Sequence, residues 1–72
     1  MKMKRYVYYT PFRPPTPGAI PINGLVECND YGERTYIPFI NREVWGSATY
    51  VRKLSDGEID SFELMEGPVY EL

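Results

Sequence analysis

The pattern of apolar and polar positions along the chain predicts several short strands. Residues 4–10 are rich in β-branched and aromatic side chains, which favours a strand with large groups on both faces. Residues 25–29 and 35–40 predict two further strands, separated by turn-forming residues at 29–32. Because Pro38 has no backbone N–H, we expect the second of these two strands at an edge or in an irregular excursion.

The strongest local signal is a predicted strand at about 44–52 that leads into a helix start. Ser55 and Glu58 have the Ser-x-x-Glu spacing of a capping box, in which each side chain binds a backbone N–H of the first helical turn. Leu54 and Ile59 occupy the two positions of a hydrophobic staple in the same register. We therefore expect a short helix after Ser55 that depends on docking against the sheet.

Proline and glycine positions divide the rest of the chain. The segment at about 11–24 is too rich in proline for a helix or a central strand, so we expect an extended crossover over the sheet. Its Pro-x-x-Pro spacings leave open a second role, as a ridge for an aromatic groove. Gly46 indicates a bulge or the close approach of another group. Gly67 and Pro68 are expected to end the helix, with 69–72 a tail or a last edge strand.

Together these elements predict an α+β fold. It consists of a small antiparallel sheet of three to four strands with one short C-terminal helix packed on it. We expect residues 1–72 to form a single domain and leave the strand order open. A chain of 72 residues buries a small core, which raises the expectation that it self-associates.

Composition excludes the common catalytic and metal sites. The chain has one cysteine and no histidine, so neither an internal disulfide nor the usual zinc ligand sets can form. The Ser-His and Cys-His nucleophile pairs are equally unavailable. Cys28 is expected to be a small buried hydrophobe on a strand. We therefore expect no enzyme activity, no metal and no cofactor.

Charge is unevenly distributed although the formal net charge is only −2. Residues 1–23 carry only basic charges and residues 55–72 only acidic ones, an arrangement in which the two ends of a small domain attract each other. The basic residues also alternate with aromatic ones, as in proteins that bind single-stranded nucleic acid. This alternative would use Lys2, Lys4, Arg5 and Arg13.

No apolar run is long enough to span a membrane, and the first ten residues lack the apolar core of a signal peptide. With a free thiol and no export signal, the cytoplasm is the expected location. No membrane partner is expected.

Aromatic content gives the main expectation for function. The chain has seven tyrosines and one tryptophan, residue types that are enriched at interface hot spots. We therefore expect a non-enzymatic accessory protein that acts through protein–protein contacts, either as a homo-oligomer or with another protein. The expected contact residues are Tyr6, Tyr8, Tyr9, Trp45 and Tyr50.

Three segments carry a family resemblance. They are Pro14 to Pro21, Val44-Trp45-Gly46 with Tyr50, and Leu54 to Ile59 with Phe62-Glu63-Leu64. With these segments the chain resembles a group of small uncharacterised bacterial proteins often carried on phage-like or mobile elements. The resemblance implies a stand-alone cytosolic accessory protein and no assigned activity.

Overall fold

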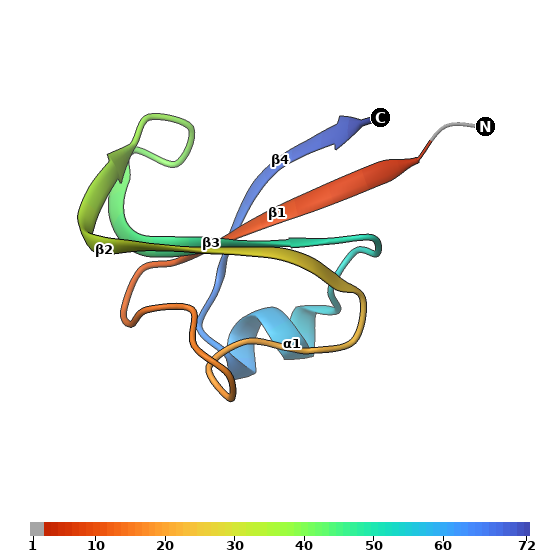
Figure 1. The fold of residues 1–72 in the computed structure, drawn as a ribbon, viewed down its shortest axis with the longest axis horizontal. Coiled ribbons are helices and arrows are strands. Elements are labelled where there is room, and N and C mark those ends of the chain that lie inside the picture. Colours follow the sequence, from red (N-terminus) through yellow and green to blue (C-terminus); the bar gives the residue numbers. More distant parts are fainter. Residues whose placement is uncertain (1–2) are drawn as a thin grey trace.

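The protein folds into a curled four-stranded antiparallel sheet with one helix on a face (Figure 1). The computed structural model describes residues 3–72. Its elements are β1 (Lys4–Thr10), β2 (Leu25–Ile37), β3 (Arg42–Tyr50), α1 (Asp56–Ser61) and β4 (Met65–Glu71). The predicted fold class is therefore confirmed, as is the strand at residues 4–10.

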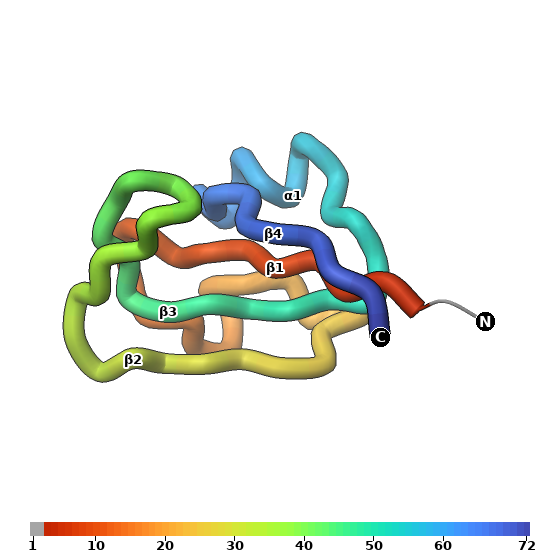
Figure 2. Tube along the Cα trace, turned by 90° about the horizontal axis from the view of Figure 1, so that it is seen from above, coloured from red at the N-terminus to blue at the C-terminus, as the bar shows by residue number. Residues whose placement is uncertain are grey.

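The strand order is β2-β3-β1-β4, so the first strand of the chain lies in the interior of the sheet (Figure 2). Tyr8 in β1 lies opposite Ala48 of β3 on one side and opposite Glu66 of β4 on the other. Both outer strands, β2 and β4, are edges. The pairings of β1 with β3 and with β4 therefore join segments that are distant in sequence, whereas β2 and β3 form a hairpin.

The core lies between the sheet and α1. Tyr8 and Tyr50 are 2% and 0% exposed, and their rings meet edge to face at a centroid distance of 5.8 Å. Such a pair adds roughly 0.5–1.5 kcal/mol to the burial of the rings themselves. Ile20, Leu54 and Leu64 complete the contact with the helix and the crossover.

The capping box forms as predicted, and both residues of the expected staple, Leu54 and Ile59, pack in or against the core. The Ser55 hydroxyl accepts a hydrogen bond from the Glu58 N–H at 3.1 Å, and the Glu58 carboxylate accepts one from the Ser55 N–H at 3.0 Å. Leu54 is buried, and its N–H donates to the Tyr8 hydroxyl at 3.0 Å. Ile59 packs against the core from the helix. Within the described residues, no helix has the length and apolar character needed to cross a membrane.

The expected turn at 29–32 is wrong, because β2 continues through it as one bent strand. The turn chemistry is present: the Gly32 N–H donates to the Asp30 carboxylate at 2.9 Å, and Gly32 has a φ of 75°. It forms a bulge inside the strand, since the register with β3 shifts between Asp30 and Thr35. The chain turns only at Pro38 to Asn41, which joins β2 to β3.

Two boundaries also differ from the sequence expectation. The long strand covers Arg42–Tyr50 and not 44–52, because it is the return arm of the hairpin that starts in β2. The last strand begins at Met65 and includes Gly67 and Pro68, which the sequence analysis placed at the end of the helix. Pro68 is tolerated because β4 is an edge strand and needs hydrogen bonds on one side only.

The segment 11–24 crosses the sheet on the face that carries α1 (Figure 1). Pro15 lies against Gly46 of β3, where a Cβ atom would come within 2.6 Å of the proline ring. The close approach expected at Gly46 is therefore confirmed. The Tyr50 hydroxyl donates to the Pro21 carbonyl at 2.7 Å, which fastens the crossover at a second point.

Candidate functional site

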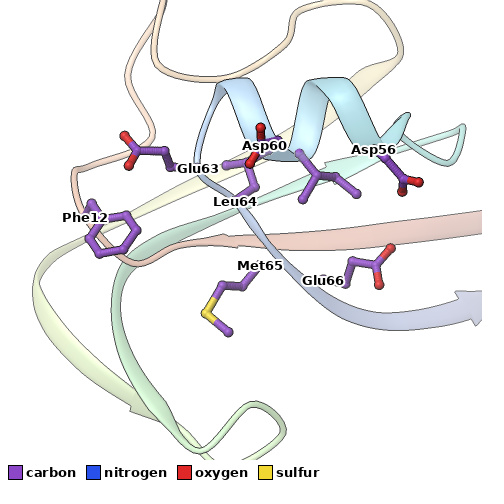
Figure 3. A pocket seen from close by; sticks show the side chains of 8 residues that line it. Phe12, Asp56, Asp60, Glu63, Leu64, Met65 and Glu66 are labelled. Carbon is purple, nitrogen blue, oxygen red and sulfur yellow. The ribbon is translucent and has the colours of Figure 1, made fainter.

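A groove opens between α1 and the start of β4 (Figure 3), and we call it the α1–β4 groove. Its volume is about 520 Å³. It is lined by Phe12, Asp56, Ile59, Asp60, Glu63, Leu64, Met65 and Glu66. Half of these side chains are apolar and half are acidic, so the groove combines an apolar floor with negatively charged walls.

The helix supplies one wall of the groove because of its spacing. Ile59, Asp60 and Glu63 lie three, four and seven residues after Asp56, which places the four along one stripe of the helix and its end. Glu63 has a φ of 53°, and this left-handed conformation ends the helix and reverses the chain. The following residues therefore return along the other wall.

The two ends of the groove differ in charge. Figure 3 shows Phe12 and Glu63 at one end, and Asp56 and Glu66 at the other, on opposite walls. At the first end, Arg13 forms an ion pair with Glu63 at 2.5 Å. This contact joins the basic and acidic parts of the sequence, as their charges led us to expect.

A second arginine lies at the Phe12 end of the groove. The guanidinium carbon of Arg42 lies 4.9 Å from the centroid of the Phe12 ring, within cation–π range. The Arg42 side chain also lies 3.6 Å from the Met65 sulfur. Within the described part of the chain, the carboxylates of Asp56, Asp60 and Glu66 form no ion pair. Unpaired negative charge is therefore concentrated at the end of the groove away from Arg13 and Arg42.

Arg52 fixes the helix that forms the groove wall. Its guanidinium donates two hydrogen bonds to the Glu58 carboxylate, at 2.9 and 2.7 Å, and a third to the Asn23 carbonyl at 2.8 Å. The hydrogen bonds from Arg52, together with that from the Ser55 N–H, lower the pKa of Glu58 to about 2. The same contact raises the pKa of Arg52. The first turn of α1 is thereby tied to the end of the crossover.

A second hollow, of about 210 Å³, follows the first along β4. It is lined by Tyr6, Val7, Tyr8, Lys53, Glu66, Gly67 and Val69. Glu66 lines both hollows, so it lies where one gives way to the other. Because Tyr6 pairs with Val69 and Tyr8 with Glu66, the second hollow continues on the same face of the sheet.

The structure separates the five aromatic residues predicted for protein contacts. Tyr8, Tyr9 and Tyr50 are 2%, 8% and 0% exposed and belong to the folded interior. Tyr6 and Trp45 are partly exposed, but they lie on opposite faces of the sheet. The five rings therefore do not form one surface, and among them Tyr6 and Tyr8 line the second hollow.

The basic residues of the nucleic-acid alternative are also dispersed. Lys2 lies outside the described residues. Lys4 lies opposite Glu71 in the β1–β4 pairing, and the Arg5 guanidinium donates to the Lys4 carbonyl at 3.2 Å. Arg13 lies beyond the other end of β1 and pairs with Glu63. Among the residues described, a basic side chain therefore lies close to an acidic one at each end of β1.

Cys28 does not lie in the buried position expected from alternation. Cys28 lies opposite Ala48 on β2, which is an edge strand, and it is exposed there. Its thiol donates to the Pro15 carbonyl at 3.0 Å. Desolvation and the nearby Asp30 raise the pKa of this thiol, which favours its protonated form. In residues 3–72, no group of His, Cys, Asp or Glu is arranged to hold a metal ion.

Sequence reasoning missed the α1–β4 groove. It identified residues 55–72 as acidic but placed the end of the helix at Gly67 and Pro68, so it did not expect a strand beside the helix at Met65 and Glu66. A signal was available in the apolar residues next to the acids, Leu64 and Met65, which the sequence places directly before Glu66.

Comparison with known proteins identifies the family. The model of the family described as "Defence against restriction A C-terminal" matches residues 3–69. That match makes the chain a phage- and defence-associated small protein, in coarse agreement with its resemblance to proteins of mobile elements. No curated protein and no solved structure matches the chain. The chain therefore belongs to the defence against restriction A C-terminal family.

Proposed function

We propose that the chain is a non-enzymatic accessory domain in defence against restriction, and that it acts by binding another protein through the α1–β4 groove. The observation that carries this proposal is the groove itself. Its apolar floor, with Phe12 exposed at one end, and its acidic walls offer both contact area and charge, the two properties that specify a protein partner. The family name supports the biological setting.

Binding is favoured over catalysis by the chemistry of the side chains. The chain has no histidine to serve as a general base, and the raised pKa of Cys28 keeps its thiol in the less nucleophilic form. Glu58, the carboxylate whose pKa is lowered most, forms an ion pair with Arg52 that fixes the helix, so it is not free to act as a general acid or base. We propose that the protein acts in the cytoplasm, where a free thiol is stable.

The groove can be tested by reversing one of its charges. We would measure the survival of incoming unmodified DNA in a restricting host, relative to a host without restriction, with the wild type and with Asp60→Lys. Loss of protection with Asp60→Lys is expected. Glu33→Lys makes the same charge change on the exposed part of β2, away from the groove, and should keep protection.

Two results would count against this proposal. One is full protection by Asp60→Lys, provided that circular dichroism shows the variant to be folded. The other is equal loss of protection by Asp60→Lys and Glu33→Lys, which would indicate a dependence on net charge and not on the groove.

Self-association is a second part of the proposal. Large hydrophobic side chains remain exposed, among them Ile22 at 65% and Phe39 at 63%, and contact between two copies would cover such groups. The sheet edges are less suited to this contact, because β2 carries bulges and β4 contains Pro68. Light scattering over a range of concentrations tests the point, and a constant monomer mass would contradict it.

The single-stranded nucleic-acid alternative receives less support. Arg13 is ion-paired with Glu63, and Lys4 lies beside an acidic residue in the sheet. A binding titration at two salt concentrations separates the alternatives, because phosphate contacts weaken steeply with salt.

A further inference from the structure

From the two hollows along β4 we infer that the ligand of the α1–β4 groove is an extended segment of a partner protein, with a lysine or arginine between two apolar residues at alternate positions. This inference rests on the proposed function and specifies the chemistry of the partner. Its basis is the order of groups along the α1 side of β4.

The groups beside β4 are spaced like those of an extended chain when they are measured on the neighbouring β1, because the β1–β4 register shifts between Glu66 and Val69. Leu64 lies two residues before Glu66, and Glu66 and Val69 lie opposite Tyr8 and Tyr6, which are themselves two residues apart. Alternate residues of an extended strand lie about 7 Å apart and point to one side. An apolar, an acidic and an apolar position therefore follow one another at the repeat of a strand.

The acidic centre of this track accepts a cation. Figure 3 shows the Asp56 and Glu66 side chains on opposite walls at the same end of the groove. These carboxylates have no ion pair within the described residues, whereas Arg13 and Arg42 lie at the other end of the groove, near Phe12. A lysine or arginine placed between the two walls would complement this charge.

The flanking positions accept apolar side chains. On one side the floor is formed by Leu64 and Ile59, with Phe12 beyond them, and Phe12 is 54% exposed. On the other side the second hollow presents Tyr6 and Val69. Lys53 also lines this second hollow, so a second basic residue of the ligand is disfavoured there.

Synthetic peptides test this chemistry directly. The probe is a short labelled peptide with leucine, lysine and leucine at alternate positions, titrated with the protein and followed by fluorescence anisotropy. Two matched peptides carry glutamate in place of lysine, or glycine in place of both leucines. We expect the leucine–lysine–leucine peptide to bind about tenfold more tightly than either matched peptide.

Protein variants locate the binding site. Glu66→Lys is expected to weaken binding of the lysine peptide about tenfold, while Glu33→Lys changes it less than about twofold. Phe12→Ser should weaken binding, whereas Phe39→Ser, at a similarly exposed site on the β2–β3 turn, should not. Asp60→Lys serves as a second charge variant if Glu66→Lys does not fold.

The outcomes separate this inference from the proposed function. If the lysine and glutamate peptides bind alike, or if Glu66→Lys and Asp60→Lys bind as the wild type does, the inferred ligand chemistry is wrong. The proposed function would then still stand if Asp60→Lys alone abolishes protection against restriction. If that variant protects fully, the groove itself is not the binding site.

Discussion

The hydroxyl of Tyr50 donates a hydrogen bond to the backbone carbonyl of Pro21 at 2.7 Å, so a fully buried ring of the sheet holds the proline-rich crossover in place. Removing the hydroxyl leaves that carbonyl without this partner. We expect Tyr50→Phe to lower the free energy of unfolding by about 1 to 2 kcal/mol. Urea denaturation measures the change, with Tyr70→Phe, at an exposed tyrosine of the edge strand β4, as the control. Equal stability of Tyr50→Phe and the wild type would show that the bond contributes nothing.

The same residue predicts how stability changes at alkaline pH. Burial is the main cause that raises the pKa of Tyr50 to about 12 from its ordinary value of 10.0. The unfolded chain therefore releases this proton first, and stability is retained below pH 10 and lost as the pH rises toward 12. Denaturation at a series of pH values should show this loss. Tyr50→Phe should lose less stability over the interval, and an unchanged slope would contradict the assignment to Tyr50.

At acid pH the corresponding group is Glu58. Its pKa is lowered to about 2, chiefly by the hydrogen bonds from Arg52, so the folded protein holds the charged form more strongly than the unfolded chain does. Its contribution is present above the ordinary pKa of 4.5 and is lost as the pH falls toward 2. Glu58→Gln should flatten the pH dependence of unfolding in this range. The control is Glu33→Gln, for which the wild-type slope is expected.

Gly46 is expected to resist any added side chain. A Cβ at this position would meet the Asn29 carbonyl and come within 2.6 Å of the Pro15 ring, and neither group can move without shifting backbone. Gly46→Ala should therefore cost about 3 kcal/mol in thermal or urea denaturation. Gly57→Ala is the matched substitution in α1, where the nearest atom is the Ser55 hydroxyl at 3.9 Å. It should stabilise the protein by up to about 1 kcal/mol, and a similar loss at both sites would refute the steric explanation.

Short-range signals account for the parts of the fold that sequence predicts well. The capping box at Ser55 and Glu58 needs only neighbours in the chain, and the strand at residues 4–10 follows from its own composition. By contrast, the bulge after Asp30 has the local chemistry of a turn. β2 continues past this bulge because it pairs with β3 on both sides of it. The partner residues in β3 lie outside the short window on which local propensity depends.

The candidate site depends even more on long-range contacts. Tyrosine is a residue type typical of interfaces, but Tyr8 and Tyr50 are buried in the core. The Tyr8 hydroxyl accepts a hydrogen bond from the Leu54 N–H and the Tyr50 hydroxyl donates one to the Pro21 carbonyl, so both polar groups have partners inside the fold. The groove requires the chain to reverse at Glu63, which brings the strand after the helix back beside it. No spacing rule predicts that reversal.

The interior position of β1 also bears on how the protein is made. One flank of β1 pairs with β3, but the other can be covered only after β4 has left the ribosome. A partly synthesised chain therefore carries an open strand edge, the kind of surface on which nascent proteins aggregate or recruit chaperones. Native folding of this domain is expected to be a late and cooperative event in its biosynthesis.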